Sequence, residues 1–509
     1  MAKEFTLTFD SLFTSGLRQN ERAPRNSQVF TTLTNVRVRP EGLTAYEPLI
    51  QLISDSTLSA NSVSYAFPFP QLFRGKYITL LVSATKLFVV NETTWTLTPV
   101  TTYDLYNTGL TKTITSGGSW HFTDFWNTFI LYNGSCCIIK FGGDSKYYVQ
   151  DTLTIQTGCA HRGRAIQAGF STSNFWSSDW KSFWTSRITQ YDPPYSNVIK
   201  TMADIGPNWI HWSSIGGGDL RFLHDLTWAT TGPYAAGYTS DNPMVLDFAL
   251  RNEWGWMPMS FQGSVLAVKS LGMNVFVGGE DGIEVLTQAS SPRPTFGSTL
   301  RLPFGLAGRS AVGGGEDAII FLDESGCLWR LDANLKLDRL DYSEFLNPML
   351  GTEIIITQDP HSRDFFIANT DDAYSLSRDG GLSKVPQKPT SISFVQGGSV
   401  GMFTSETDES FVAVSEWFDL GTPGLKQLYE VLVTGAPDEL LEVAFDYRYD
   451  RDSSETRTPY VYTNSHGVAF NLISGNEFRL VLRRQSSYAS VQIQKVEIKW
   501  KPIDARYRH

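Results

Sequence analysis

Hydrophobic and polar residues alternate with a period of two along most of this chain, and the alternating runs end at Gly, Pro, Asn or Asp. Successive side chains of a strand point to opposite faces of a sheet, so this alternation predicts half-buried β-strands. Runs with the 3.6-residue period of an amphipathic helix are nearly absent. The pattern therefore predicts an all-β protein.

The strand patterns recur in units of about 25 to 40 residues, each with three or four short strands joined by tight turns. The clear units are Lys76–Val100, Trp120–Val149, Ser264–Gln288, Gly308–Leu340 and Thr352–Ser377. Repetition at this spacing favours a β-propeller, whose blades are four-stranded sheets around an axis, over a single sandwich. We expect about six degenerate blades, once residues 398–420 or the N-terminal strand close the ring.

Changes in the pattern divide the chain into three regions. Residues 1–60 are predicted to form an N-terminal arm with the first strands, residues 61–410 the propeller, and residues 411–509 a C-terminal β-sandwich-like domain. The last region has longer alternating strands, at 411–420, 425–435, 440–450, 477–485 and 491–502. Residues 155–256 are less regular and rich in Trp and Gly, and we interpret them as one blade with long, aromatic-rich excursions.

Composition and charge narrow the function classes. Aromatic residues make up 13% of the chain and Gly occurs 42 times, which is typical of strands and turns. The formal charge is −10 at pH 7, which argues against a basic face that clamps nucleic acid non-specifically. Only 18% of residues are charged, as expected either of a surface covered by partner subunits or simply of a low-charge β protein.

The cysteines and the hydropathy pattern predict neither cross-links nor a membrane span. Cys136, Cys137, Cys159 and Cys327 form no CxxC pair and no Cys/His cluster with metal-ligand spacing, so we expect no disulfide framework, metal or cofactor. Residues 1–10 alternate like a strand and do not resemble a secretory signal. No run approaches the ~18 uninterrupted apolar residues of a spanning helix. We expect a soluble product made in the cytoplasm.

Motifs of enzymes are not found in the sequence. The seven His are scattered, and no GxSxG elbow, Walker loop, HExxH helix or dinucleotide fingerprint occurs. An Asp-box turn would favour a sialidase-like glycosidase with paired carboxylates at the propeller mouth. The closest matches are partial: near Ser377 the closing Trp is missing, and around Asp323 and Trp329 the Gly lies one residue late. We therefore predict no enzymatic activity.

Two groups of residues are candidates for contact surfaces. An aromatic cluster in residues 174–184 gathers more aromatic surface than a solvated loop usually has. Its members are Phe175, Trp176, Trp180, Phe183 and Trp184. The second group is Arg479, Arg483 and Arg484, near the basic tail 499–509. We expect the aromatic cluster to be either blade core or an inter-subunit or lumen-facing contact, and the arginines either a dock for an acidic partner or a solvated strand face.

Three segments resemble a known family. Residues 25–49 (RNSQVFTTLTNVRVRPEGLTAYEPL) resemble the start of tail nozzle proteins of short-tailed bacteriophages, also called hub or packaged-DNA stabilisation proteins. Those chains open with an extended arm, an Asn-Val-Arg-like strand and a Gly-Leu turn. Residues 304–331, beginning FGLAGRSAV, are similar to a mid-chain blade of that family, and residues 282–296 to its strand followed by a Pro-containing link.

The resemblance implies a structural role in a virion tail, after assembly in the host cytoplasm. Six copies would form a homohexameric nozzle below the portal and the adaptor, or head-to-tail connector, and would also contact tail fibre or needle proteins. The nozzle would seal the packaged DNA and then open as a conduit, and an acidic lumen would let DNA slide without sequence-specific binding. Two alternatives stay open: a receptor- or carbohydrate-binding propeller and, third, a propeller glycosidase.

Overall fold

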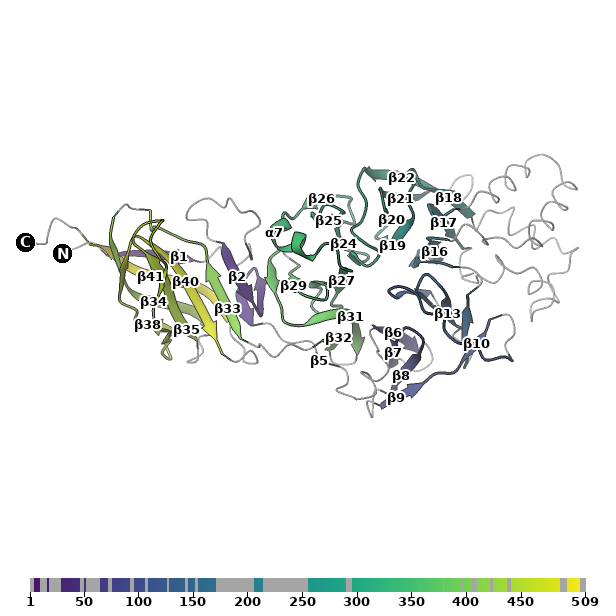
Figure 1. Cartoon of the computed structure of the whole chain (residues 1–509), viewed down its shortest axis with the longest axis horizontal. Helices are drawn as coiled ribbons and strands as arrows, with labels where there is room; N and C mark the ends of the chain where they lie inside the picture. The colour runs from purple at the N-terminus through teal and green to yellow at the C-terminus, as the bar shows by residue number, and fades with distance from the viewer. Residues whose placement is uncertain are drawn as a thin grey trace, which may run out of the picture. The chain divides into compact units, whose positions relative to one another are not determined.

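The structure is a computed structural model, and its regular structure is almost entirely β (Figure 1). It describes residues 4–9, 16–17, 29–45, 50–51, 65–71, 76–91, 96–105, 109–125, 128–141, 145–151, 154–170, 206–213, 255–289, 295–378, 380–395, 398–404, 410–421, 424–436, 441–485 and 492–503. Within these residues the helices are one turn of α-helix, α7 (Ser343–Leu346), and the 3₁₀ turn η4 (Asn347–Met349). The predicted all-β class is confirmed. No helix among the described residues is long and apolar enough to cross a membrane.

The chain forms two compact units. Unit 1 comprises residues 1–50, 340–390 and 403–509, and unit 2 comprises residues 51–339 and 391–402. This division differs from the predicted boundaries, because the repeat unit at 352–377 and the segment 30–45 both belong to unit 1. Long-range strand pairing, which a local pattern does not reveal, produces the difference.

Unit 2 is a series of small antiparallel sheets, each built from consecutive strands (Figure 1). The first two sheets are β6 (Tyr65–Gln71), β7 (Lys76–Val82), β8 (Leu87–Asn91), β9 (Thr96–Pro99), and β11 (His121–Phe125), β12 (Thr128–Tyr132), β13 (Cys137–Phe141), β14 (Tyr147–Gln150). The next are β15 (Thr157–His161), β16 (Arg164–Ala168), β17 (Trp209–Trp212), β18 (Gly255–Pro258), then β19 (Val265–Leu271), β20 (Asn274–Gly279), β21 (Ile283–Ala289), β22 (Thr295–Leu302), and β23 (Val312–Gly314), β24 (Ala318–Leu322), β25 (Leu328–Asp332), β26 (Leu337–Arg339).

These sheets match the predicted repeat units closely. The short β10 (Thr102–Asp104) adds to β14 in parallel. Residues 155–256 supply the single sheet β15–β18, as predicted, and the long excursions within it lie outside the described residues. The sequence pattern missed β6, whose two prolines pair with β7 at Thr79 and Tyr77. Proline lacks the N–H of a ladder donor, which places such a strand at the edge of its sheet.

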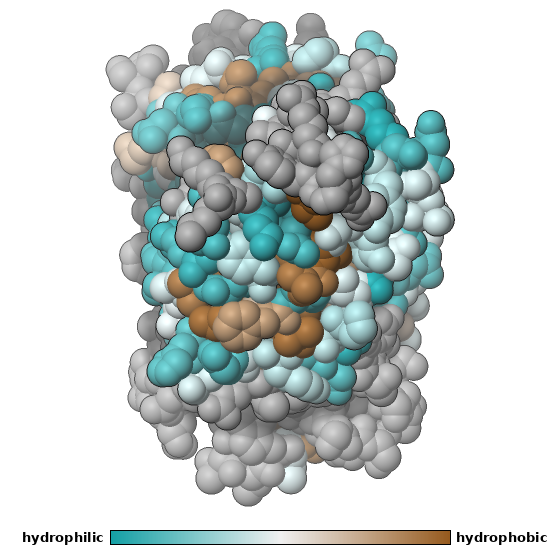
Figure 2. Space-filling view, turned by 90° about the vertical axis from the view of Figure 1, so that its left-hand side faces the viewer, coloured by the Kyte–Doolittle hydropathy of each residue, from teal (hydrophilic) through white to brown (hydrophobic). Residues whose placement is uncertain are grey.

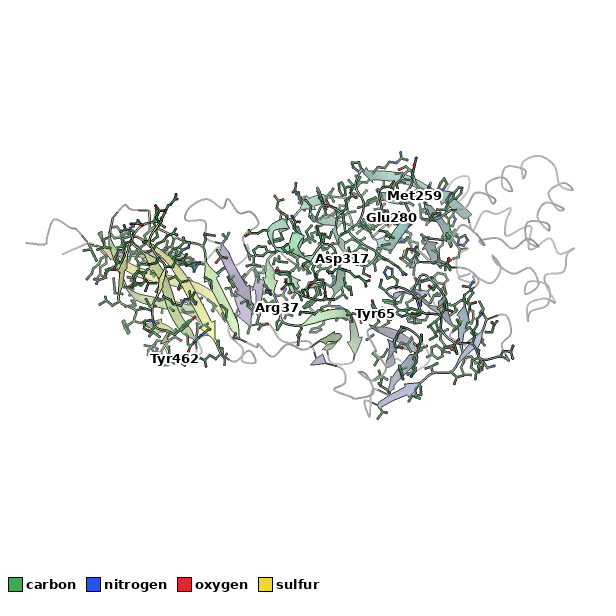
Figure 3. All side chains as sticks on the ribbon, viewed as in Figure 1. Arg37, Tyr65, Met259, Glu280, Asp317 and Tyr462 are labelled. Carbon is green, nitrogen blue, oxygen red and sulfur yellow. The ribbon has the colours of Figure 1, made fainter. Side chains whose placement is uncertain are left out.

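Consecutive sheets of unit 2 pack face to face, and side chains fill the space between them (Figure 3). Val275 and Val277 of β20 face the sheet β15–β18, whereas Phe276 between them faces β24 and its neighbours. Both faces of the sheet β19–β22 are therefore buried, which explains why β20 is apolar at consecutive positions. Stacked four-stranded sheets with two buried faces have the packing expected of propeller blades.

A polar side chain closes the turn between the second and third strands in three sheets of unit 2 and in the series β27–β30 of unit 1. It directly follows the second strand and is Ser83, Asn133, Asp323 or Asn369. In each turn its oxygen accepts a hydrogen bond at 2.7–2.9 Å from the backbone N–H three or four residues later. Ser, Asn and Asp are favoured at such positions because their short side chains reach turn amides. This recurrence is evidence for structural repeats that overall sequence similarity does not show.

Unit 1 contains two larger sheets. The first is a ten-stranded sheet of β27 (Ile355–Gln358), β28 (Phe365–Ala368), β29 (Ala373–Leu376), β30 (Leu382–Lys384), β2 (Phe30–Thr34), β33 (Phe411–Ser415), β40 (Glu477–Arg484), β35 (Glu442–Arg448), β36 (Thr456–Arg457) and β37 (Val461–Tyr462). The second is a seven-stranded sheet of β3 (Val36–Arg39), β4 (Gly42–Ala45), β41 (Gln492–Pro502), β34 (Lys426–Ala436), β38 (Val468–Ala469), β39 (Ile473–Gly475) and β1 (Phe5–Phe9). The three-stranded sheet of β31 (Lys388–Val395), β32 (Gly398–Thr404) and β5 (Ile50–Gln51) belongs mostly to unit 2.

The five long strands predicted for the C-terminal region are confirmed as β33, β34, β35, β40 and β41. Aromatic contacts join the two sheets: Phe9 lies 5.4 Å from Phe418, which lies 6.2 Å from Phe478 on β40 (ring centroids). All three rings are buried. Two sheets joined by such a core have the construction of a β-sandwich.

The first strands predicted within residues 1–60 pair with strands far along the chain. β1 pairs with β41, and β2 lies between β30 and β33, so these strands are parts of the sheets of unit 1. Asn35 links β2 and β3, which belong to different sheets, and it has the left-handed φ of 57°. Asn tolerates this conformation better than most residues. A local pattern could not reveal these pairings, because β33 and β41 lie some 380 to 490 residues away in sequence.

Candidate functional site

The predicted contact residues fall in very different places. The aromatic residues Phe175, Trp176, Trp180, Phe183 and Trp184 lie outside the described residues. All three arginines of the second group, Arg479, Arg483 and Arg484, are on β40 in unit 1. Arg484 is only 4% exposed, so it cannot form part of an open surface. Arg483 keeps 29% of its side chain exposed, and a contact role stays a prediction for that residue.

Arg483 and Arg479 form cross-strand ion pairs with β35. The register places Arg483 opposite Glu442 and Arg479 opposite Asp446. Arg483 Nε donates to Glu442 Oε2 at 2.6 Å, and its guanidinium lies 3.6 Å from the centre of the Tyr460 ring. Opposite charges at facing positions stabilise paired strands. The charges of Arg479 and Arg483 are therefore compensated within the sheet, and a dock for an acidic partner stays a prediction.

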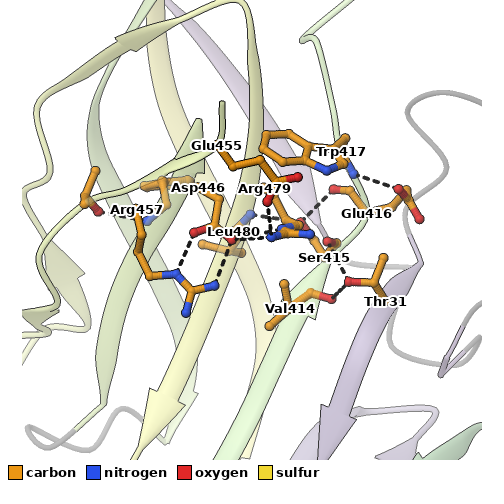
Figure 4. A network of polar contacts seen from close by, with 12 residues as sticks. Thr31, Val414, Ser415, Glu416, Trp417, Asp446, Glu455, Arg457, Arg479 and Leu480 are labelled. Atoms are coloured by element: carbon orange, nitrogen blue, oxygen red, sulfur yellow. Dashed lines mark hydrogen bonds and ion pairs between the residues drawn. The ribbon is translucent and has the colours of Figure 1, made fainter. Parts of the chain in front are cut away.

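Asp446 is the centre of this network (Figure 4). Arg457 donates to its two oxygens at 2.6 and 2.9 Å, and Arg479 donates to Oδ2 at 2.9 and 2.7 Å. Burial by itself would raise the pKa of Asp446, but the hydrogen bonds to the two arginines prevail and hold that pKa below its usual value. Arg479 also lies over the Trp417 ring, at 4.9 Å from its centre. The arrangement links β35 and β40 and so stabilises the sandwich.

Residues in two of the segments that resemble the nozzle family hold neighbouring strands and sheets in contact. In the first, Arg37 and Arg39 both bind the buried carboxylate of Asp364, at 2.9 and 3.0 Å; Arg37 is labelled in Figure 3. Gly42 has a φ of 140°, and a Cβ there would lie 2.0 Å from the carbonyl oxygen of Ile493. The Asn-Val-Arg strand and the Gly-Leu turn thus hold β3 and β4 inside unit 1.

The second segment begins with a close backbone contact. A Cβ at Gly305 would lie 1.9 Å from the carbonyl oxygen of Glu280, so only glycine fits. A few residues further on, Ser310 Oγ donates to Ser119 Oγ at 2.8 Å, and Arg309 Nη2 donates to the carbonyl oxygen of Tyr132 at 3.4 Å. This segment therefore ties the sheet β23–β26 to the sheet β11–β14 within unit 2.

Strands β11, β15 and β19 of unit 2 bring together polar side chains that sequence analysis missed. His121 Nδ1 lies 3.1 Å from Thr157 Oγ1, and the backbone N–H of Val268 donates to the same oxygen at 3.3 Å. Lys269 follows Val268 directly. Burial, together with the positive charges of Arg309 and Lys269, lowers the pKa of His121 well below its usual value. These residues come from three sheets, so no local motif could have revealed them.

A serine, a histidine and a glutamate also meet in unit 2, but not as a catalytic triad. His161 Nδ1 lies 2.9 Å from Ser270 Oγ, and Ser270 Oγ donates to Glu316 Oε1 at 2.8 Å. Because the serine proton goes to Glu316, His161 must donate to the serine and cannot act as its base. Burial lowers the pKa of His161 to about 4. The group is an acid-sensitive structural contact.

The partial Asp-box at Asp323 is a turn of the repeated type described above. Asp323 Oδ1 accepts from Ser325 N and Cys327 N, both at 2.9 Å, and Oδ2 accepts from Trp329 Nε1 at 2.8 Å. The carboxylate is 3% exposed and fully engaged, so it has no free oxygen for catalysis. The resemblance to a glycosidase motif is thus explained by turn geometry.

The cysteines are free thiols, and burial makes three of them poor nucleophiles. Burial raises the pKa of Cys136 to about 11 and that of Cys159 to about 12, and it raises the pKa of Cys137 well above its usual value. Within the residues that the structure describes, no three His, Cys, Asp or Glu side chains are grouped so that they could hold a metal ion.

Unit 1 also exposes large apolar side chains. They are Phe470 (65% exposed), Leu472 (72%), Tyr462 (55%) and Tyr449 (53%). Phe470 and Leu472 lie between β38 and β39, the two short strands that pair with β34. On the face at the β1 and β41 end of unit 1, apolar side chains gather in patches among hydrophilic ones (Figure 2). Exposed apolar residues at the margin of a sheet are candidates for a protein contact.

Comparison with known proteins identifies no family. No family model matches the sequence, and no curated protein matches it. Among solved structures, AztD from Citrobacter koseri aligns with 83% of this chain and 90% of its own, at 10% identity and a TM-score of 0.31. Hsv2 from Kluyveromyces lactis aligns with 60% of this chain and 81% of its own, at 8% identity and a TM-score of 0.30.

A third solved structure is PorZ, a bacterial surface component of the type-IX secretion system of Porphyromonas gingivalis. It aligns with 69% of this chain at 12% identity and a TM-score of 0.33. The match spans 35% of PorZ, about a third of its length. Identities and TM-scores this low assign neither a family nor an activity.

Proposed function

We propose that this chain is a non-catalytic structural protein of a bacteriophage tail, a nozzle or hub subunit that acts through contacts. The principal support is that the residues shared with the nozzle family, including Arg37, Gly42 and Gly305, are those that hold strands and sheets together. Acidic side chains that a sequence search would single out, such as Asp323 and Asp446, are saturated by internal hydrogen bonds. This arrangement favours a rigid scaffold.

The blade-type sheets are proposed to form a propeller. Support comes from unit 2, where the inner strands β11, β15 and β19 contact one another in succession and the stacked sheets share apolar cores. A propeller buries its strand edges and resists deformation, which suits a component that transmits force during ejection of DNA. The expected number of about six blades stays a prediction.

Six copies are proposed to surround a channel below the portal and adaptor, with tail fibre or needle proteins as further partners. Six copies at −10 each carry a formal charge of −60. An acidic lumen would repel phosphate and let DNA slide.

Phe470 and Leu472 are proposed to contact a neighbouring copy. Each side chain is more than 60% exposed, so burying both in a contact removes apolar area from water.

The first experiment measures the mass of the purified protein by light scattering, alone and with portal–adaptor complexes, and images the mixtures by negative stain. The proposal expects six-fold rings that cap the complex. The double variant Phe470→Ser/Leu472→Ser should weaken ring formation, whereas Leu110→Ser, an equally apolar change at a 59% exposed position of unit 2, is the matched control. A monomer that ignores the complex at all concentrations would refute the nozzle function.

A receptor- or carbohydrate-binding propeller is the second candidate. The exposed rings of Tyr449, Tyr462 and Phe470 favour it, since aromatic faces can stack on sugars. Glycan arrays and binding to host cell envelopes distinguish the two candidates: saturable glycan binding that is lost in Tyr462→Ala, without ring formation, would replace the nozzle assignment. Hydrolysis of the bound glycan would restore the third possibility, a propeller glycosidase.

A further inference from the structure

The three-stranded sheet of β31, β32 and β5 combines strands from the two ends of unit 2. β5 lies directly before the first four-stranded sheet, β6–β9, whereas β31 and β32 come after the last strand of the series, β26. The four-stranded sheets of unit 2 are built instead from consecutive strands. The pairing of β32 with β5 therefore joins the end of unit 2 to its beginning.

A buried hydrogen bond connects this closing sheet to the first four-stranded sheet. The backbone N–H of Ala66 on β6 donates to Ser391 Oγ on β31 at 2.7 Å, across 325 positions of sequence. The same kind of contact joins two neighbouring sheets elsewhere in unit 2, where the N–H of Val268 on β19 donates to Thr157 Oγ1 on β15 at 3.3 Å. In both contacts the amide and the hydroxyl belong to the first strand of their sheets. The closing sheet thus precedes β6–β9 in space as β15–β18 precedes β19–β22.

The free edge of β6 offers one amide to this contact. Ala66, Pro68 and Pro70 alternate along β6, and alternate residues of an antiparallel strand direct their amide nitrogens to the same side. Because Ala66 donates to Ser391 and not to β7, all three positions face away from β7. Proline has no N–H, so Ala66 is the single donor of this edge between residues 66 and 70. Such an edge does not extend into a paired strand, and the two sheets meet without a hydrogen-bonded ladder.

We propose that the junction between β31 and β6 is a latch, at which unit 2 opens while each four-stranded sheet stays folded. Consecutive sheets are held together by short connections, whereas this junction joins segments far apart in the chain and has the longest loop to close. β5 contributes only two residues to the closing sheet. The inference does not depend on the proposed tail function, because it concerns contacts within unit 2.

The chain connectivity gives the latch a mechanical role. The chain enters the closing sheet from β30 and leaves it toward β33, and both of these strands belong to unit 1. Tension on either connection therefore acts directly on the closing sheet. The latch can then release before any four-stranded sheet unfolds, because partial openings of low free energy precede global unfolding.

Native-state hydrogen exchange of the full chain at low urea concentrations tests the latch. In wild type, peptides 65–82 and 388–404 should share one opening reaction and should exchange at least about 10-fold faster than peptide 265–289. Ser391→Ala leaves the buried N–H of Ala66 without its acceptor. This variant should speed the exchange of both latch peptides by about a further 10-fold and leave peptide 265–289 unchanged.

Ser213→Ala is the matched control. The N–H of Ala165 donates to Ser213 Oγ at 2.9 Å, a buried contact of the same kind that lies within the sheet β15–β18. This variant should speed the exchange of residues 157–168 and leave the two latch peptides as in wild type.

Two results would overturn the latch. The first needs no variant: in wild type, peptides 65–82 and 265–289 would open with the same free energy and the same dependence on urea. The second is an effect of Ser391→Ala that is confined to one of the two latch peptides or spreads equally to all peptides of unit 2.

Discussion

Removal of the Asp323 carboxylate should destabilise unit 2 far more than removal of a similar carboxylate in the next turn of the same sheet. Asp323 accepts four hydrogen bonds, from Ser325 N (2.9 Å), Ser325 Oγ (2.7 Å), Cys327 N (2.9 Å) and Trp329 Nε1 (2.8 Å). It is 3% exposed, so water cannot readily replace all of these contacts. Asp323→Ala leaves the indole and two amides without their acceptor.

The magnitude follows from the number of lost contacts. A hydrogen bond to a charged group contributes ~1.5–3 kcal/mol, and part of that loss is recovered where the turn amides reach solvent. We therefore expect Asp323→Ala to lower the free energy of unfolding of unit 2 by ~3–5 kcal/mol. Asp323→Asn keeps Oδ1 but presents a donor to Trp329 Nε1, so about half of that loss is expected.

Asp332→Ala is the matched control. Asp332 Oδ1 accepts from Asn334 N at 2.8 Å and Lys336 N at 2.9 Å, in an exposed turn between β25 and β26. Its loss should cost about 1 kcal/mol. Equilibrium unfolding in urea gives the free energies, and hydrogen exchange of the peptide 318–339 reports the turn directly. If the two alanine variants agree within about 0.5 kcal/mol, the buried carboxylate is not the element that holds this hairpin.

Three further outcomes are expected. Burial lowers the pKa of His161 to about 4 and that of His211 to about 3, below the ordinary 6.5, so the folded state favours the neutral rings. Unit 2 should therefore keep its full stability above pH 6.5 and lose about 1.4 kcal/mol per pH unit for each histidine as the pH falls toward 4. Urea unfolding at a series of pH values measures this loss. Gly305→Ala should cost about 3 kcal/mol, because its Cβ would collide with a backbone carbonyl, as measured by thermal unfolding. Asp446→Asn should lower the free energy of unfolding of unit 1 by about 2 kcal/mol, as measured by urea unfolding. This value is modest because the arginine partners of Asp446 are partly exposed to solvent.

Each of these outcomes has a control within the chain. The double variant His161→Gln/His211→Gln should flatten the pH dependence; an unchanged slope would assign it to other groups. Gly308→Ala meets nothing within 4 Å and should be neutral, so equal effects at positions 305 and 308 would contradict the steric argument. Glu455→Gln removes only the 3.2 Å contact of a 49% exposed side chain with Arg479 and should change unit 1 little.

The sequence by itself determined the strands and many of the turns. Period-two alternation is a local property, and it correctly predicted β33, β34, β35, β40 and β41 as well as most strands of unit 2. The turn residues are local as well, since the oxygens of Asn133 and Asp323 bond amides within four residues. The polar residue directly after the second strand can be located in the sequence once that spacing is known.

Only the tertiary structure decided which strands pair and which charges meet. Arg479 and Arg483 form a basic cluster on one strand, and their partners Asp446 and Glu442 lie 33 and 41 residues away, opposite them only in the register of β35 and β40. β2 joins β30 and β33 across most of the chain, and His121, Thr157 and Val268 come together from three sheets. Local patterns are set by the geometry of one strand, whereas these contacts depend on the choice among many possible partners, which is decided by the burial and hydrogen bonding of the whole fold.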